Sequence, residues 1–327
     1  MASLVVCGAI NWDITCFVEH MPVPGEEVTI ECITRVSGGT GGNVAVAAAR
    51  ILGVKEVALI GTLGEDDIAR QQIATLEDER VITTGIQHIA GEESGQAYIL
   101  VDQTGQNVIA SHLGANAGLS SQHLNKAQIK EQLDECRGIV LTDPPLEVVA
   151  ELINLARRRD VPVLWDPGIL ISPNREAVQS LAKEVEVLFL NETEAGALLG
   201  ADEPDMGLQR LQRLGLRNHT VLKLGAQGAA LLEPASSLIV QVPALPVKEL
   251  GLNVISTVGC GDVFAGVFAA YRVLGASLGE SLIIASAAAS LNATRPETRG
   301  SPDRASLEEM VDRSHGLGFA AQERKLS

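Results

Sequence analysis

The chain has few aromatic residues. Aromatic side chains make up 3% of its 327 residues, whereas hydrophobic residues as a whole make up 46% and glycines number 32. This composition argues against an aromatic-rich binding surface and favours close packing of helices on a sheet. A chain of this length can bury a large core, and we expect one main α/β domain with an appendage.

Positive charge is also scarce. The 25 Lys and Arg residues are outnumbered by 41 Asp and Glu, which gives a formal net charge of −16 at pH 7. A surface with this balance repels nucleic acid and anionic membranes. The one local basic cluster, residues 157–159, is interpreted as the solvated end of a helix. We therefore expect neither nucleic acid nor a membrane as a partner.

Cysteines are few and scattered. They are odd in number and form no CxxC pair, standing at Cys7, Cys16, Cys32, Cys136 and Cys260. This pattern indicates neither a disulfide framework nor a zinc knuckle. We expect buried thiols in a reducing compartment, and hence a cytoplasmic protein.

Long apolar runs are missing as well. Arg272 and Glu280 interrupt the best candidate for a membrane span. The apolar run at residues 4–10 has no basic segment before it and ends at polar Asn11 and Asp13, so we expect a first β-strand rather than a signal peptide. Polar residues beyond the carboxyl end of a central strand lie where open α/β sheets bind ligands. Turn chemistry is an equally good explanation of these two residues.

Strands and helices alternate from residue 57 onward. The predicted strands cover residues 57–60, 139–142, 161–165, 185–190 and 219–224. The predicted helices between them cover residues 66–76, 146–158 and 192–199. This alternation predicts an α/β fold with a doubly wound, mostly parallel central sheet flanked by helices.

The C-terminal part departs from the alternation. Two strands at 229–232 and 238–242 are expected to be antiparallel. Helices are predicted near 263–274, 278–293 and 307–313. Residues 319–327 are charged, and we expect them to fray.

Two strand pairs have no helix between their members. One pairs residues 14–20 with 28–36, and the other pairs 96–101 with 107–111. They predict a small β-sheet that projects as a lid over a cleft or as a dimer surface, because exposed strand edges invite pairing. The expected division is a main α/β domain (1–14, 38–95 and 112–327) and a β-lid (15–37 and 96–111).

The segment SGGTGG at 37–42 precedes Asn43 and a helical run at 44–52. Its glycines would let the backbone meet a small ligand, whose hydroxyls Asn43 could hold as donor and acceptor. The segment is not a P-loop, because it lacks the Gly-Lys-Ser/Thr ending, and it is not a GxGxxG dinucleotide turn. A flexible glycine linker is the alternative.

The segment VISTVGCGDVFAGVFAA at 254–270 predicts a strand, a tight turn and a helix start. Backbone N–H groups at such a helix N-terminus suit a phosphate or a developing oxyanion. Asp262 lies where the helix macrodipole favours a carboxylate. Read alone, it is more simply a helix cap than a catalytic group.

Taken in order, these segments resemble the ribokinase-like (PfkB) sugar and nucleoside kinases. The matching segments are GAINWDI, SGGTGGNVAVAAARILG, GTLGEDD, NETE at 191–194, KLGAQG at 223–228 and STVGCGDVFAG. The resemblance implies a ribokinase-like fold and an ATP-dependent kinase that phosphorylates a hydroxymethyl group of a sugar or nucleoside. It also implies Mg²⁺ as cofactor and a homodimer formed through the β-lid.

The resemblance assigns roles to individual residues. Asp262 would be the general base, and the N–H groups of Gly259, Cys260 and Gly261 would form an anion hole. The acceptor would be held by Asn11, Asp13, Gly39, Thr40, Asn43 and Asp143. The nucleotide would be held by Asn191, Lys223, Gly225 and Gly228, with Glu194 near Mg²⁺ through water.

Some positions depart from the family pattern. Ser256 replaces an aspartate that helps the family bind a monovalent cation, and TRPETRGSP replaces a glycine-containing stretch, so potassium activation is in doubt. Thr40 stands where ribokinases often carry lysine, which weakens the case for free ribose. Lys223 replaces a common threonine and could contact phosphate or pack at a strand end.

Two alternatives stay open. One is a sugar-phosphate acceptor, such as fructose 6-phosphate or ribose 1-phosphate, which requires basic residues at the acceptor pocket; Arg35, Arg175 and Arg295 are candidates. The other is a non-catalytic module that senses a sugar or nucleotide. The retained Asp262 argues against the second, because a sensor has no need of a base.

Overall fold

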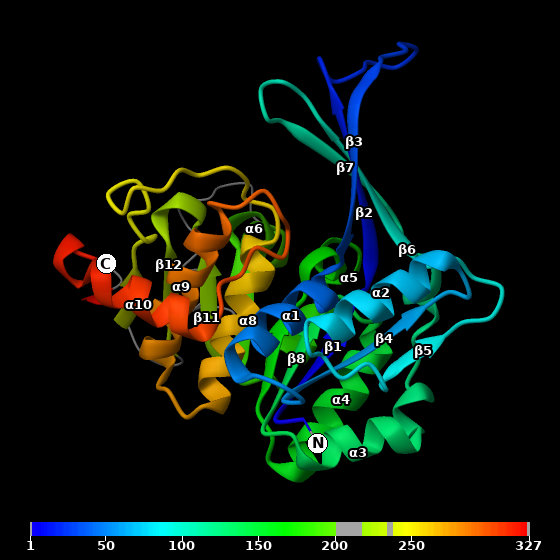
Figure 1. Ribbon diagram of the computed structural model, residues 1–327. Helices are drawn as coiled ribbons and strands as arrows, with labels where there is room; N and C mark the ends of the chain where they lie inside the picture. Colours follow the sequence, from blue (N-terminus) through cyan, green and yellow to red (C-terminus); the bar gives the residue numbers. More distant parts are fainter. Residues whose placement is uncertain (1, 201–217, 234–237, 326–327) are drawn as a thin grey trace.

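A large, mostly parallel sheet forms the centre of the protein. The computed structural model describes residues 2–200, 218–233 and 238–325, and within them one sheet has the strand order β14-β13-β12-β11-β10-β9-β8-β1-β4-β5 (Figure 1). Its parallel strands are β1 Leu4–Gly8, β4 Val57–Leu63, β5 Ile86–His88, β8 Gly138–Thr142, β9 Val163–Asp166, β10 Val187–Asn191 and β11 His219–Lys223. Its antiparallel strands are β12 Ala229–Leu232, β13 Leu238–Val242 and β14 Gln322–Lys325.

The central strands are buried on both faces, as the apolar run at the start of the chain predicts. Successive residues of a strand point to opposite faces. Accordingly, Leu4 and Val6 join one hydrophobic cluster, and Val5 and Cys7 join the other. Near-continuous apolar strands are typical of a parallel sheet covered by helices on both sides.

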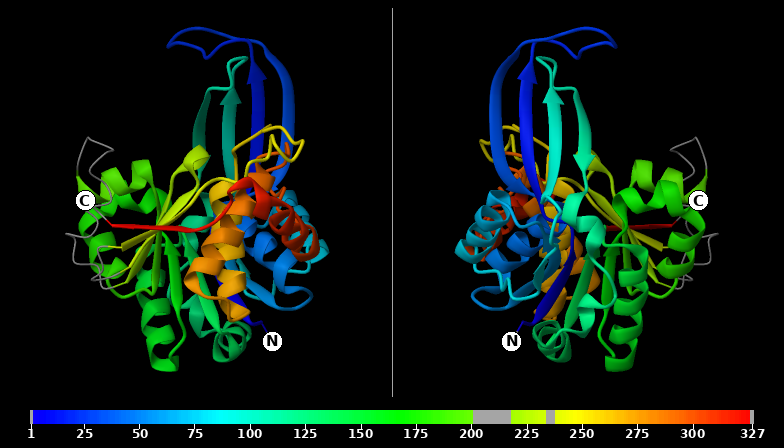
Figure 2. Two further views of the ribbon diagram at one scale, coloured as in Figure 1. Left: turned by 90° about the vertical axis from the view of Figure 1, so that its left-hand side faces the viewer. Right: turned by 90° about the vertical axis from the view of Figure 1, so that its right-hand side faces the viewer.

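Helices cover both faces of the sheet (Figure 2). The first cluster is built with α1 Thr40–Leu52, α2 Asp67–Asp78, α8 Cys260–Val273, α9 Leu278–Asn292 and α10 Arg304–Ser314. The second is built with α3 Ala127–Glu135, α4 Leu146–Arg159, α5 Ile171–Ala182 and α6 Glu192–Leu199. Short 3-10 turns lie at Gly114–Gly118, His123–Asn125, Gly168–Leu170, Gly225–Gln227 and His315–Leu317.

The contact between α1 and α8 sets the distance between two predicted site residues. A Cβ added to Gly266 would lie 2.5 Å from the carbonyl oxygen of Val44. Glycine at this position therefore lets the two helix backbones approach closely. The approach brings the first turns of α1 and α8, which carry Asn43 and Asp262, next to each other.

A second, smaller sheet projects from the main body (Figures 1 and 2). It has the order β3-β2-β6-β7, with β2 Asn11–Val18, β3 Ile30–Gly38, β6 Gly95–Val101 and β7 Asn107–His112. The hairpins β2–β3 and β6–β7 are antiparallel, and β2 pairs with β6 in parallel. The α/β architecture with a small additional sheet is confirmed.

The strand predicted at Val254 and Ile255 is wrong. Both side chains are exposed, and the segment belongs to neither sheet. Instead, the N–H groups of Ile255 and Ser256 donate to the carbonyl of Ala293 at the end of α9, at 2.7 and 3.1 Å. β-Branched residues form a strand only where their backbone can pair with another strand, and here the backbone N–H groups bond a helix end.

The C-terminal segment was expected to fray, and this is wrong for residues 322–325. They form β14, which pairs antiparallel with β13. This pairing occupies an edge of β13 that would otherwise leave backbone groups without partners. The helices α3 and α5 and the strand β5 were not predicted either.

Two further expectations concern cysteines and membranes. Cys7, Cys16 and Cys136 are buried free thiols, as expected, but Cys32 is exposed, because it lies on β3 of the projecting sheet. Within the described ranges, no helix has both the length and the apolar character needed to cross a bilayer.

Candidate active site

The predicted site residues gather at one edge of the large sheet. Parallel strands all end at the same edge, so polar residues at their carboxyl ends become neighbours. Asp143 follows β8, Asn191 and Lys223 end β10 and β11, and Asp166 ends β9. The N-termini of α1 and α8 lie at the same edge, because the side chains of Asn43 and Asp262 meet there.

The turn before α8 has the backbone geometry of a tight helix start. Gly259 is the residue before the helix and has a φ of 75°, and a Cβ there would lie 2.3 Å from the Thr298 carbonyl oxygen. No side chain caps this helix start. The N–H of Cys260 donates to the Thr257 carbonyl over a long 3.3 Å. An anion at this turn would compete with that bond for the Cys260 N–H.

Asp262 lies in the first turn of α8 and receives a hydrogen bond of 2.8 Å on Oδ2 from Nδ2 of Asn43. Burial raises the pKa of Asp262 to about 7, against the Asn43 hydrogen bond, which lowers it. The neighbouring Asp166 raises this pKa further, and Lys223 lowers it. A carboxylate that titrates near neutrality is suited to accept a proton there.

The SGGTGG segment makes room for polar side chains of the protein itself. A Cβ on Gly38 would lie 2.0 Å from Oδ2 of Asp13, and one on Gly42 would lie 2.4 Å from Nη2 of Arg299. Gly39 has a φ of 84°, and its Cβ would collide with the backbone N of Asn11 at 2.4 Å. These glycines therefore let the protein's own groups pack closely here, and the contact with a ligand that the sequence predicted for this segment stays a prediction.

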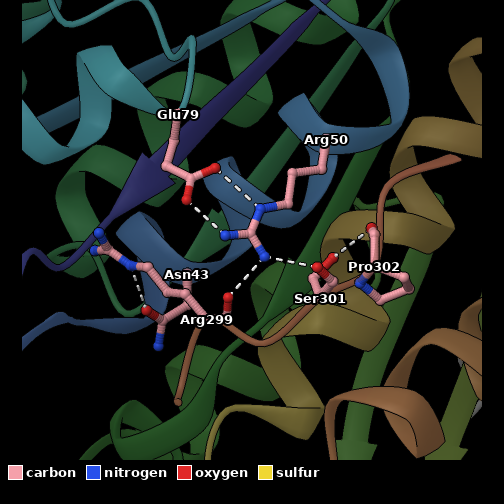
Figure 3. A network of polar contacts seen from close by, with 6 residues as sticks. All are labelled: Asn43, Arg50, Glu79, Arg299, Ser301 and Pro302. Atoms are coloured by element: carbon pink, nitrogen blue, oxygen red, sulfur yellow. Dashed lines mark hydrogen bonds and ion pairs between the residues drawn. The ribbon is translucent and has the colours of Figure 1, made fainter. Parts of the chain in front are cut away.

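Asp13 and Arg299 are both buried beside these glycines, with 7% and 9% of their surface exposed. Burial raises the pKa of Asp13 to about 6, and the positive charge of Arg299 opposes this rise. Burial lowers the pKa of Arg299 to about 10, which still leaves it charged at neutral pH. Its guanidinium donates to Oδ1 of Asn43 (Figure 3).

Asn11 is held by a residue that the sequence did not single out. Its Oδ1 accepts a 2.9 Å hydrogen bond from Nδ2 of Asn116, which also bonds the backbone of Ile10. Its carbonyl accepts from Nε2 of Gln72 at 2.5 Å. These contacts keep Asn11 at the junction between β1 and the projecting sheet.

Thr40 and Asp143 contact each other. The Thr40 hydroxyl donates to Oδ2 of Asp143 at 3.2 Å, while Oδ1 of Asp143 is buried without a partner among the described residues. Burial raises the pKa of Asp143 to about 8, and the charges of Asp166, Asp262 and Glu194 add to this rise. Asp143 has a φ of 58°, so its conformation is strained for a side-chain-bearing residue.

Lys223 connects the turn before α8 to the neighbouring strand end. Its Nζ lies 2.5 Å from Oδ2 of Asp166, and a Cβ added to Gly261 would lie 3.4 Å from the same Nζ. Burial lowers the pKa of Lys223, but Asp166 and Glu194 outweigh it, so the pKa lies above its usual value. Lys223 therefore holds a positive charge beside the first turn of α8.

Asn191 and Glu194 form a reciprocal cap at the start of α6. Asn191 Oδ1 accepts from the Glu194 N–H, and Glu194 Oε2 accepts from the Asn191 N–H, both at 2.8 Å. This is the structural role of a first-turn glutamate, and it occupies one oxygen of each side chain. Burial, and next to it the charge of Asp166, raise the pKa of Glu194.

Gly225 and Gly228 form the turn that follows β11. Gly225 has a φ of 55° and open space where a Cβ would be, whereas a Cβ on Gly228 would lie 2.0 Å from the Val242 carbonyl. Gly228 is therefore required for packing against the end of β13. Only Gly225 of this pair borders open space.

Asp166 and Arg299 belong to the site although the sequence analysis did not propose them. Asp166 could have been found, because it is a polar residue at the carboxyl end of a predicted strand, as Asn11 is. Arg299 lies within the divergent TRPETRGSP segment, where nothing local distinguishes it from exposed Arg295. No group of three or more His, Cys, Asp and Glu able to hold a metal ion occurs in the described part of the chain.

Comparison with known proteins shows the family to which the chain is similar. The profile of the pfkB family carbohydrate kinase matches residues 1–304. A deoxyribokinase from Salmonella typhi is 31% identical, with 83% of this chain and 86% of that protein covered. An ATP-dependent ribose-1-phosphate kinase from Halopiger xanaduensis is 27% identical, with 92% and 95% covered. The structure of Arabidopsis thaliana ribokinase complexed with ribose and ATP superposes with a TM-score of 0.82 at 27% identity, covering 95% of this chain and 99% of that one.

Proposed function

The chain belongs to the pfkB family of carbohydrate kinases, and on this basis we propose that it transfers a phosphoryl group from ATP to a hydroxymethyl group of a pentose-like sugar. The enzyme is thus a phosphotransferase, and the sensing alternative is set aside. The observation that carries the proposal is Asp262, a carboxylate with a pKa of about 7 at the helix start that offers N–H groups to an anion.

In the proposed reaction, Asp262 takes the proton of the acceptor hydroxyl as that oxygen bonds to the terminal phosphorus of ATP, and the bond from this phosphorus to the bridging oxygen breaks to release ADP. The N–H groups of Gly259, Cys260 and Gly261 stabilise the charge on the transferring group. Lys223 adds a positive charge beside this turn. Positioning and charge stabilisation are the main contributions that phosphoryl transfer needs from a protein.

The acceptor is proposed to be a neutral sugar. The side chains proposed to face it include Asp13, a carboxylate that would repel a phosphate on the acceptor, and Asp143, whose pKa of about 8 keeps it mostly protonated at neutral pH. Among the described residues beside them, Arg299 is the one buried cation, and its guanidinium is already bonded to Asn43 and Gly38. Asn11, Gly39 and Thr40 complete the set that we propose for the acceptor hydroxyls.

A sugar-phosphate acceptor is the second candidate. It is favoured by the similarity to the ribose-1-phosphate kinase of Halopiger xanaduensis. The cations proposed for it from the sequence, Arg35, Arg175 and Arg295, are all exposed. Arg35 lies on β3 of the projecting sheet and Arg175 on α5, so the described part of the chain offers such a phosphate less support.

The donor-side residues fit Mg²⁺. Asp166 and Glu194 offer carboxylate oxygens, which Mg²⁺ prefers, and Glu194 is proposed to act through water, because Mg²⁺ usually keeps several waters and binds substrate phosphates. An ion that keeps several waters does not need a closed cluster of protein ligands, and none occurs in the described ranges. Bound with the triphosphate, Mg²⁺ neutralises negative charge on the phosphates. Asn191 and Gly225 are proposed to border the nucleotide, and Gly228 to shape the same turn by packing against the end of β13. No monovalent cation is proposed, because Ser256 lacks a carboxylate.

We also propose that the projecting sheet, residues 15–37 and 96–111, is a lid and a homodimer surface. Six apolar side chains of its strands are exposed: Phe17, Ile30, Ile33, Tyr98, Val108 and Ile109. Light scattering of the purified protein checks the dimer, and a monomer at all concentrations would contradict it. A cytoplasmic location is proposed from the free thiols, which suit a reducing compartment.

The test of the function is a coupled assay of ADP release. Ribose, deoxyribose, fructose, adenosine, cytidine, ribose 1-phosphate and fructose 6-phosphate are compared as acceptors with Mg²⁺ and ATP. The proposal expects turnover with a free pentose and much less with the sugar phosphates. Preference for a sugar phosphate would support the second candidate, and no turnover with any acceptor would count against both.

A further inference from the structure

Two arginines and their partners form a polar network that includes Asn43 (Figure 3). Arg299 lies between α9 and α10, and its Nε donates to Oδ1 of Asn43 at 2.9 Å. Its Nη2 donates to the Gly38 carbonyl at 3.0 Å. Gly42 leaves the space that this guanidinium occupies. The group is thus held between the end of β3 and the first turn of α1.

This contact fixes which way the amide of Asn43 points. A guanidinium can only donate hydrogen bonds, so it selects the amide oxygen of Asn43. The amide NH₂ must then point to the other side, where its Nδ2 donates to Oδ2 of Asp262 at 2.8 Å. The reversed amide would place NH₂ against a cation and oxygen against a carboxylate.

Arg50 secures the backbone that carries Arg299. Its Nη1 donates to the carbonyls of Arg299 and Ser301, at 2.7 and 2.6 Å. Its Nε and Nη2 bind both oxygens of Glu79 (Figure 3). Because a bidentate pair fixes the guanidinium plane, Arg50 holds the segment in one position.

A direct contact of Arg299 with an anionic substrate is less well supported. Its Nε and Nη2 already have protein partners, and Nη1 is buried without solvent contact. An incoming phosphate would have to displace the Asn43 or Gly38 contact, or reach the unpartnered Nη1 by moving the groups that bury it. The arrangement suits a group that acts through its neighbour.

We propose that Arg299 is a positioning residue for phosphoryl transfer, which orients Asn43 so that its amide binds Oδ2 of Asp262 and leaves the other carboxylate oxygen to take the acceptor proton. The proposal rests on the proposed role of Asp262 as general base. It assigns a function to the segment in which this chain departs from the family pattern.

Loss of Arg299 should change the pH dependence of turnover. The Asn43 hydrogen bond favours the ionised form of Asp262 and therefore lowers its pKa. Without Arg299 the amide can turn away, and the pKa of Asp262 should rise. The other charged groups that act on Asp262 or are acted on by it are Asp13 of β2, Asp143 after β8, Asp166 of β9, Lys223 of β11 and Arg299 itself.

The experiment compares Arg299→Met, Arg299→Lys and a control, Arg272→Met. Arg272 is a half-buried arginine that binds the Ala276 carbonyl at the other end of α8, about 15 Å along the helix from Asp262. Arg299→Met should lower kcat about ten- to hundredfold, with little change in KM for ATP, and move the acid limb of kcat to higher pH. Arg299→Lys should recover part of the rate, and the control should keep the wild-type pH profile.

A double-mutant cycle with Asn43→Ala separates positioning from general structure. If Arg299 acts through Asn43, adding Arg299→Met to Asn43→Ala should cost little further rate. The proposal would be overturned if Arg299→Met lowered the rate equally in the wild-type and the Asn43→Ala enzyme. It would also be overturned if a folded Arg299→Met enzyme kept the acid limb of the wild-type pH profile. If Arg299→Met does not fold, Asn43→Ala alone decides: an unshifted acid limb at full rate shows that the amide does not act on Asp262 and overturns the proposal.

The outcome can be told apart from failure of the proposed function. Full activity of the Asp262→Asn enzyme would exclude Asp262 as the general base, whatever the effect of replacing Arg299. An inactive Asp262→Asn enzyme together with an unaffected Arg299→Met enzyme would remove only the role of Arg299.

Discussion

Asn43 and Asp262 are joined by a 2.8 Å hydrogen bond although they lie 219 residues apart in the chain. One is in the first turn of α1 and the other in the first turn of α8. The close approach of these helices at Gly266 makes the bond possible. The bond thus joins Asn43, a residue proposed to hold the acceptor, to the proposed base.

The first prediction concerns the base. Asp262→Asn should lower kcat by about 10²–10⁴-fold, because the amide cannot accept the acceptor proton. The similar shape of the side chain should preserve the fold and nucleotide binding. The coupled ADP assay measures the rate, and calorimetry with an ATP analogue measures binding. A variant with nearly normal turnover would exclude Asp262 as the base.

The second prediction is the pH profile of the wild-type enzyme. A base works in its deprotonated form, and the pKa of Asp262 is raised to about 7. The rate kcat should therefore be low in mild acid and rise with pH through about 7. Measuring kcat with saturating substrates at each pH gives this rise directly. A flat profile across this range would contradict the assigned pKa.

The third prediction concerns stability and follows from the raised pKa of Asp143, about 8. The folded protein binds this proton more tightly than the unfolded chain does, so the stabilisation is complete below the unfolded pKa and is lost as pH rises through about 8. Asp143→Asn should thus raise Tm relative to wild type at about pH 9 and change it little at about pH 5. Equal shifts at both pH values would argue that the effect is not electrostatic.

The fourth prediction concerns Lys223. Lys223→Met should leave Asp166 as an unpaired, largely buried carboxylate and destabilise the fold by about 3 kcal/mol. It should also raise KM for ATP or lower kcat, because a positive charge beside the α8 turn is lost. The double variant Lys223→Met/Asp166→Asn serves as control. It should recover stability without recovering activity, whereas recovery of both would make Lys223 purely structural.

The fifth prediction concerns the space that glycine provides for Asp13. Gly38→Ala would place a methyl group 2.0 Å from the Asp13 carboxylate and should cost about 1–3 kcal/mol of stability. KM for the sugar should rise as Asp13 is displaced. Gly279→Ala on α9 is the matched control, since nothing lies within 4 Å of its added Cβ. It should be neutral or stabilise the helix by up to about 1 kcal/mol; similar losses in both variants would refute the steric explanation.

Local patterns were sufficient for most of the fold. The apolar runs that became β1, β8 and β10 are buried on both faces, and a strand of that composition has few other stable environments. The same reasoning failed at Val254 and Ile255, where the backbone of Ile255 and Ser256 bonds the end of α9 and does not join a sheet, and at residues 322–325, where a charged segment pairs with the edge of β13. Propensity is local, whereas the availability of an edge depends on the whole sheet.

Some features of the candidate site likewise follow from local sequence, whereas others depend on the whole fold. By itself the sequence determined the order of the motifs, the GCGD turn with Asp262 at a helix start, and the polar residues at the ends of strands, because each depends on a few consecutive residues. Only the tertiary structure decided that the SGGTGG glycines accommodate Asp13 and Arg299, that Asn43 donates to Asp262, and that burial raises the pKa of Asp262 to about 7. Such contacts join residues far apart in the chain, and desolvation depends on what surrounds a group in three dimensions, so neither is written in any single segment.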